Sequence, residues 1–209
     1  TYTNNQTVCF GGSYIINGNT YTSSGTYTDV LTAANGCDST VTTNLTVLPQ
    51  FTVSASSSPA NGTACSGSPV NLSMVGYASP VNTYQWSDAN GTINGATSAT
   101  YAANASGSYS LTVTNANGCV ATSNAVTVTI ITPSTPGSLS TSNIQLNKAT
   151  MNWGAVANAH HYDVRMRVQG SGSWTILMTN IFTTSKQKSN LTSSTVYEWQ
   201  VRSACSPDS

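Results

Sequence analysis

Apolar and polar residues alternate in short runs along the chain, and residues that form tight turns separate these runs. Within residues 107–115, Tyr109, Leu111 and Val113 alternate with small polar residues, so one face of a strand would be buried. Asn-Gly pairs, which favour the positive φ angles of two-residue hairpin turns, begin at positions 17, 35, 61, 90, 94 and 117. No stretch repeats its apolar residues with the period of a helix. The pattern predicts an all-β protein of short strands.

One sequence unit occurs twice in the chain. Residues 25–37, GTYTDVLTAANGC, align without a gap with residues 107–119, GSYSLTVTNANGC, and a Thr/Val-rich stretch follows each copy. The shared order is a strand, an Asn-Gly turn, a cysteine and a second strand. We therefore expect each ANGC sequence to be the hairpin turn that joins the last two strands of two related β-sandwich domains.

Prolines divide this pattern into three segments. Pro49 follows the strand-like NLTVL, and Pro133 and Pro136 lie in ITPSTPGSL. We expect a small disulfide-tied β repeat domain over 1–49, a β-sandwich over 50–132 and a third domain over 133–209. The predicted architecture is a series of tandem β-sandwich domains.

The cysteines indicate an oxidising compartment. Four of the five fall two to a segment, Cys9 with Cys37 and Cys65 with Cys119, and pairing within each segment is the economical interpretation. Each such bridge would contribute roughly 3 to 4 kcal/mol, which matters for domains with small cores. Cys205 then has no partner in the chain.

Metal binding is the rival explanation for these cysteines. The chain has no CxxC motif, and its two histidines, His160 and His161, lie in a different segment from the four paired cysteines. This arrangement does not suit a zinc site, so we expect neither a metal nor another cofactor. On a strand the adjacent histidines would point to opposite faces, and we expect them to be surface residues.

The charged residues are few and unevenly placed. They make up 6% of the chain, and every Lys and Arg lies at or after Lys148. No basic stripe could follow a phosphate backbone, so we do not expect nucleic-acid binding. No apolar run reaches the roughly 18 residues of a membrane span, and the first residues, TYTNNQ, are not those of a leader. We expect a mature product or an internal fragment that does not insert into membranes.

Candidate catalytic groups do not form a recognisable set. The six acidic residues are scattered, and the serines lie in no Gly-x-Ser-x-Gly elbow. We therefore expect no enzymatic activity. Tyr21, Tyr101 and Trp174 could stack on sugars if they are exposed, although single surface aromatics usually have no function.

The second segment resembles an immunoglobulin-like domain. TYQW supplies a core tryptophan, Trp86, and ASGSYSLTV supplies Tyr109 at the entry of the sixth strand. The segment departs from the antibody pattern at Leu111, which stands where that pattern has an intersheet cysteine. The variant resembles Ig-like and PKD-like modules of large surface proteins of Bacteroidetes, and residues 17–47 are similar to another repeat of those proteins. They include gliding-motility adhesins and other cargo of the type IX secretion system.

The third segment resembles a fibronectin type III domain. The resemblance gives packing roles to Trp153, Tyr162, Leu191 and Tyr197, and it turns Val164, Met166 and Val168 inward with Tyr162. The residues expected to face outward on neighbouring strands are Arg165, Arg167, Glu198, Gln200 and Arg202. Such a domain needs about 90 residues and seven strands. The last strand is therefore missing, and we expect the chain to continue rather than to receive a strand from another molecule.

One motif suggests a covalent modification. The sequence DST, residues 38–40, fits the acceptor pattern of O-glycosylation in Bacteroidetes and would lie on an exposed turn. A glycan on Ser39 is one interpretation, and an ordinary turn serine is the other.

These patterns together favour a non-enzymatic module outside the cell. We expect part of a large cell-surface adhesin or stalk, whose partners are neighbouring domains of the same polypeptide and surface glycans or other cells. Two alternatives remain open. The segment could be the non-catalytic accessory region of a secreted hydrolase, or the subunit of an extracellular filament that self-assembles by strand exchange.

Overall fold

The computed structural model describes residues 1–32, 36–76 and 81–206, and their regular structure is entirely β, which confirms the predicted fold class. Across this part of the chain, no helix could cross a membrane. Residue contacts divide the chain into two compact units. Unit 1 comprises residues 1–60, 71–103 and 107–128, and unit 2 comprises residues 61–70, 104–106 and 129–209. The three-segment division stays a prediction.

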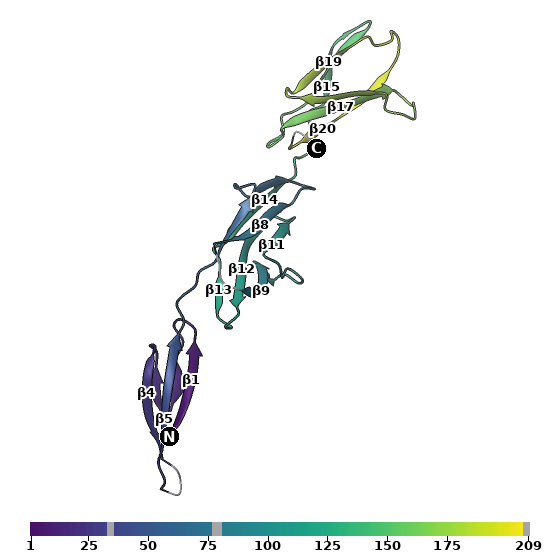
Figure 1. Ribbon diagram of the computed structural model, residues 1–209. Helices are drawn as coiled ribbons and strands as arrows, with labels where there is room; N and C mark the ends of the chain where they lie inside the picture. The colour runs from purple at the N-terminus through teal and green to yellow at the C-terminus, as the bar shows by residue number, and fades with distance from the viewer. Residues whose placement is uncertain (33–35, 77–80, 207–209) are drawn as a thin grey trace. The chain divides into compact units, whose positions relative to one another are not determined.

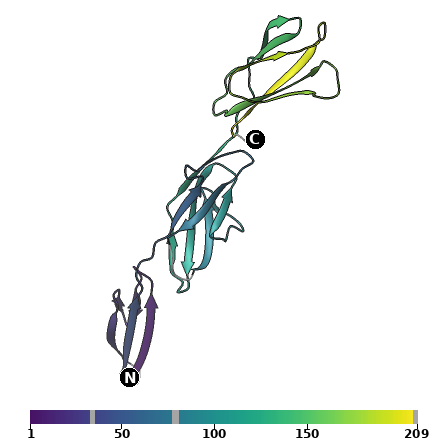
Figure 2. The same cartoon turned by 45° about the horizontal axis from the view of Figure 1, so that its top comes forward.

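The first part of unit 1 is a three-stranded sheet with a parallel edge strand. Its order is β1-β5-β4, and the central strand β5 runs parallel to β1 and antiparallel to β4 (Figures 1 and 2). A separate hairpin of β2 and β3 turns at Asn17 and Gly18, whose φ angles of 47° and 79° suit a two-residue turn. The strands are β1 (Tyr2–Val8), β2 (Tyr14–Ile16), β3 (Asn19–Tyr21), β4 (Gly25–Leu31) and β5 (Ser39–Val47).

The rest of unit 1 has two sheets. One has the order β11-β8-β6, and the other contains β10-β9-β12, to which β13 and the start of β14 add. Leu72, Trp86, Leu111 and Val113 are completely buried, and the Trp86 indole Nε1 donates a hydrogen bond to the Ser98 carbonyl at 3.0 Å. The strands are β6 (Ser54–Ser58), β8 (Val70–Val75), β9 (Val81–Asp88), β10 (Gly91–Thr92), β11 (Thr100–Ala103), β12 (Gly107–Asn115), β13 (Val120–Thr122) and β14 (Val126–Ile131).

The Gly-x-Tyr sequence opens both repeat copies, and its glycine lies beside the tyrosine ring in each. A Cβ atom at Gly25 would lie 3.3 Å from the Tyr27 ring, which is a tight contact, whereas one at Gly107 would lie 3.6 Å from the Tyr109 ring, which is an ordinary one. Only in the first copy does the glycine relieve a close approach of the tyrosine ring. The Tyr27 hydroxyl then donates to the Ser23 carbonyl at 2.8 Å, so the ring also fixes the chain that enters β4.

The second ANGC sequence forms the hairpin turn that the repeat predicts. Asn115 N–H donates to the Cys119 carbonyl at 2.9 Å, and Gly118 has a φ angle of 79°. The buried Asn115 side chain accepts hydrogen bonds from the N–H groups of Asn117 and Cys119. The first copy lies between the antiparallel strands β4 and β5, but its residues 34 and 35 are outside the described residues.

Unit 2 contains two three-stranded sheets, β15-β16-β19 and β18-β17-β20 (Figure 1). In addition, β7 pairs in parallel with the end of β14, from Thr129 to Ile131. Among the described residues, β20 is hydrogen-bonded only to β17, so a seventh strand beyond it stays a prediction. The strands are β7 (Thr63–Cys65), β15 (Ser140–Gln145), β16 (Lys148–Asn152), β17 (His161–Val168), β18 (Ile176–Ile181), β19 (Ser185–Ser189) and β20 (Tyr197–Ala204).

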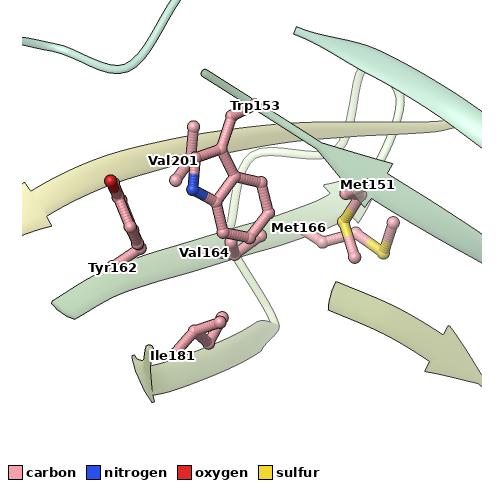
Figure 3. Packing of buried hydrophobic residues seen from close by; sticks show 7 residues of the cluster. All are labelled: Met151, Trp153, Tyr162, Val164, Met166, Ile181 and Val201. Atoms are coloured by element: carbon pink, nitrogen blue, oxygen red, sulfur yellow. The ribbon is translucent and has the colours of Figure 1, made fainter. Parts of the chain in front are cut away.

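The core of unit 2 lies between its two sheets. Figure 3 shows Trp153 among the apolar side chains that make up the buried cluster, which are Met151, Tyr162, Val164, Met166, Ile181 and Val201. Leu191 and Tyr197 are partly buried and pack against this cluster. The prediction that Val168 faces inward is wrong, because its side chain is 42% exposed. Val168 is the last residue of β17 and lies beyond the cluster.

Val164 and Val168 provide a matched test of where the core of unit 2 ends along β17. Val164→Ala should lower the free energy of unfolding by about 2 kcal/mol, because it removes two buried methyl groups and leaves a cavity. Val168→Ala, on the same strand, should change it by less than about 0.5 kcal/mol. Urea unfolding followed by tryptophan fluorescence measures both. Equal losses in the two variants would contradict the boundary.

Candidate functional site

The outer side of the β18-β17-β20 sheet carries five of the eleven Asp, Glu, Lys and Arg side chains that the structure describes. Asp163, Arg165 and Arg167 alternate along β17 with the buried Val164 and Met166. The antiparallel register with β20 places each of the three opposite a polar residue. The resulting rows are Asp163 with Arg202, Arg165 with Gln200, and Arg167 with Glu198. We call these six residues the charged face.

The two outer rows of the charged face are ion pairs. Arg202 donates from Nε and Nη2 to Asp163 Oδ2, at 3.0 and 2.9 Å. The second oxygen of Asp163 accepts the Asn180 N–H at 3.1 Å, so that carboxylate is held from two sides. Arg167 donates from Nε to Glu198 Oε1. In both rows a carboxylate compensates the guanidinium.

The middle row has no such compensation. Arg165 Nε donates to the carboxamide oxygen of Gln200 at 2.9 Å, and its Nη2 donates to the same atom. No carboxylate of a described residue lies within ion-pair distance of Arg165. Gln200 thus fixes the direction of this guanidinium without neutralising it. The charged face has a net charge of +1, and Arg165 is its source.

Trp174 contacts two of the three arginines of the face. The guanidinium carbons of Arg165 and Arg167 lie 4.6 and 4.3 Å from the Trp174 ring centroid. Contacts of this kind contribute roughly 0.5 to 1 kcal/mol each at exposed sites. The indole therefore restrains Arg165 from a second direction.

A groove opens on this face beside Arg165. Its volume is about 410 Å³, within the range of roughly 300 to 1,000 Å³ that is usual for small-molecule sites. Its lining combines charged, polar and apolar residues. They are Asp163, Val164, Arg165, Leu177, Thr179, Gln200, Val201 and Arg202.

A second hollow of about 500 Å³ lies elsewhere in unit 2 and is more apolar. Ile144, Leu146 and Val196 on its lining are 73%, 81% and 65% exposed. Hydrogen bonds with the side chain and the N–H of Thr192 lower the pKa of the Tyr197 phenol there. The Tyr197 hydroxyl thus fixes the chain upstream of β20, as a tyrosine corner does.

The disulfides differ from the predicted pairs. Cys9 bonds to Cys119 within unit 1, and Cys65 bonds to Cys205 within unit 2, with Cα–Cα distances of 5.6 and 5.9 Å. The predictions of a Cys9–Cys37 bridge, a Cys65–Cys119 bridge and an unpaired Cys205 are therefore wrong. Cys37 follows β4 as Cys119 follows β12, but neither bridge includes it.

The parallel edge strand explains why Cys9 and Cys37 are not bonded. Val8, which precedes Cys9, pairs with Val47 at the end of β5, whereas Cys37 precedes Ser39 at its beginning. The length of β5, roughly 25 Å at about 3.3 Å per residue, separates the two positions. A disulfide needs Cα atoms less than about 7 Å apart.

The prediction that both histidines are surface residues is wrong for His161. His160 is exposed, but His161 is only 2% exposed, and the two Nδ1 atoms lie 3.2 Å apart. His161 Nε2 also lies 3.5 Å from Asp163 Oδ1. Among the described residues, no group of three or more His, Cys, Asp or Glu side chains could hold a metal ion.

The three aromatic candidates for sugar stacking differ in their surroundings. Tyr21 stacks on Tyr27 with ring centroids 3.8 Å apart, and its hydroxyl donates to the buried Asp29. Burial and this hydrogen bond raise the pKa of Tyr21. Tyr101 packs against the rings of Trp86 and Tyr109. Only Trp174 contacts the charged face.

Ser39 is exposed, as expected, but it is the first residue of β5 rather than a turn residue.

The sequence predicted the outward direction of five members of the charged face and missed Asp163 and the contact with Trp174. Asp163 could have been found, because it is separated from Arg165 by one residue and so shares its side of the strand. The position of Trp174, in the loop before β18, had no comparable signal.

Solved structures resemble this chain at low sequence identity. No family model and no curated protein matches the chain. A segment of consecutive titin domains matches at 16% identity with a TM-score of 0.44, over 80% of this chain and 65% of that segment. A segment of two fibronectin type III domains from chicken tenascin matches at 15% identity with a TM-score of 0.35, over 67% of this chain and 86% of that segment. They assign no family.

One digest can test the disulfide pairing. A protease that cleaves before aspartate should place every cysteine on a different peptide, namely 1–28, 29–37, 38–87, 88–162 and 163–207. Without reduction, mass spectrometry should find 1–28 joined to 88–162, and 38–87 joined to 163–207. Reduction should separate both pairs. Peptides 1–28 and 29–37 joined to each other would instead restore the pairing within segments.

Proposed function

We propose that this chain is a non-catalytic spacer in an extracellular surface protein, and that its two bridges limit its extension. The observation that carries the proposal is that the bridges interleave. Cys65 lies inside the loop closed by Cys9 and Cys119, and Cys119 lies inside the loop closed by Cys65 and Cys205. Disulfides of this kind are typical of oxidising, extracellular compartments.

Interleaving makes the chain tolerant of backbone breaks. Every peptide bond between residues 9 and 205 belongs to at least one of the two loops. A single cleavage anywhere in that range therefore leaves both ends covalently joined. Such continuity suits a protein that must hold a load outside the cell, where proteases act on it.

The same connectivity limits how far the unfolded chain can be stretched. Two covalent paths of nearly equal length join the ends, and both cross the bridge from Cys65 to Cys205. One follows residues 1–65, and the other crosses from Cys9 to Cys119 and returns along the chain to Cys65. Each contains about 70 residues, or about 240 Å at roughly 3.4 Å per residue. The unbridged chain of 209 residues would reach about 700 Å.

Surface composition supports the same function. Only 6% of the residues are charged, and the net charge is zero, so the surface is polar with little electrostatic attraction for other molecules. Lys and Arg are absent before Lys148, which removes the sites of proteases that cut after basic residues. As the finer proposal, the parent protein is an adhesin or stalk of the Bacteroidetes type that the sequence resembles.

Single-molecule stretching tests the spacer function. Pulled from its two ends, the oxidised chain should stop lengthening at about 240 Å, and a reductant should raise this limit to about 700 Å. Cys205→Ser should give an intermediate limit of about 340 Å, because only the Cys9–Cys119 loop then remains closed.

Ser203→Ala is the matched control for Cys205→Ser. It changes a half-buried residue of β20 two positions before Cys205, whose hydroxyl donates to the Ser134 carbonyl, but it leaves both bridges intact. Its limit should stay near about 240 Å. If the oxidised wild-type chain stretches to the full unbridged length, the spacer proposal fails.

A further inference from the structure

We propose that the groove on the charged face binds the carboxylate of an acidic sugar, such as a uronic acid, and that Arg165 is the residue that anchors it. The groove lies within the β18-β17-β20 sheet of unit 2. The inference goes beyond the spacer function and does not depend on the disulfide pairing. It rests on the uncompensated charge of Arg165, on the restraints that orient it and on the mixed lining of the groove.

Arg165 has unused hydrogen-bonding capacity directed by its neighbours. A guanidinium carries five N–H donors in a planar fork, and Gln200 Oε1 accepts from only two of its nitrogens, Nε and Nη2. The remaining N–H groups suit the two oxygens of a carboxylate, which guanidinium binds in a bidentate manner. Because Gln200 and Trp174 already restrain Arg165, a ligand would lose less of its binding energy in ordering this side chain.

Charge complementarity selects an anion over a cation. The neighbouring Arg202 is 68% exposed, and it neutralises Asp163, which is 12% exposed and accepts hydrogen bonds on both oxygens. The groove therefore presents two guanidinium groups and one carboxylate that is already occupied. A second carboxylate, brought by a ligand, would restore the pairing that the outer rows of the face have.

The other lining residues favour a sugar over a simple acid or an acidic peptide. Thr179 offers a hydroxyl and Gln200 a carboxamide, which can exchange hydrogen bonds with ring hydroxyls. Leu177 is 71% exposed and forms an apolar wall against which the C–H groups of a pyranose ring can pack. A ligand that uses the whole groove must therefore combine one carboxylate, several hydroxyls and an apolar side.

NMR titration of the whole chain with galacturonate and glucuronate tests the proposal. We expect shifts of the Gln200 side-chain amide and of the Arg165 Nε–H resonance. The methyl ester of galacturonate is the matched probe, since it keeps the ring and hydroxyls but removes the charge, and it should bind at least about tenfold more weakly. Raising the salt concentration should weaken binding of the acids, because the site is open to solvent.

Two arginines of the same face provide matched variants. Arg165→Gln should weaken binding of the acids by at least about tenfold. Arg167→Gln removes the same charge beside the same indole but lies outside the groove, and it should weaken binding by less than about threefold. Equal effects of the two variants would mean that the face attracts anions without a defined site.

Leu177→Glu provides a variant that keeps the fold even if Arg165→Gln does not. Its exposed side chain can be replaced without loss of core packing, and the new carboxylate should occupy Arg165 and abolish binding. Binding of polyglutamate with the affinity of the uronates would overturn the assignment to a sugar. The absence of any shift with uronates at high millimolar concentration would overturn the site itself. Both readouts leave the stretching limit of the spacer unaffected.

Discussion

The parallel pairing of an early strand with a later one decides where the cysteines of this protein lie. In an antiparallel hairpin, the end of one strand lies beside the beginning of the next. In β1 with β5, and in β7 with β14, the two strands instead end at the same edge. Cys9 directly follows β1 and Cys65 ends β7, so each cysteine lies where the two parallel strands of its own sheet end. The cysteine after the following Asn-Gly turn cannot reach Cys9, and long-range pairing follows from the strand order.

This constraint gives the disulfides a different purpose from the one expected. A bridge within a small domain stabilises that domain by restricting its unfolded state. The observed bridges close loops with sequence separations of 110 and 140 residues, and these loops overlap. They therefore preserve the continuity of the chain as well as its folded state. This protein has few charges and small separate cores. Its disulfides keep the chain covalently joined whatever the salt concentration, and even where a marginally stable part unfolds.

The sequence predicted what depends on local chemistry. The all-β fold, the second ANGC hairpin and the burial of Trp86 and Trp153 follow from alternation, turn residues and side-chain size. What it missed depends on pairing between distant strands. The alignment of repeats matched Cys37 with Cys119, but no local pattern reports that β1 is parallel to β5. For the same reason the contact of Trp174 with Arg165 had no signal, since it depends on how a loop folds over a sheet.

One neutral residue makes the charged face a candidate binding site rather than a set of three cross-strand ion pairs. Exposed cross-strand ion pairs stabilise a sheet by only about 0.2 to 1 kcal/mol each, so three complete pairs would be an ordinary feature of a solvated face. Glutamine at position 200 keeps the geometry of the middle row and leaves its charge available. A glutamate there would form an ion pair with Arg165 and neutralise the charge that the proposed ligand needs. Gln200 therefore distinguishes this face from a set of ion pairs whose only role is to stabilise the sheet.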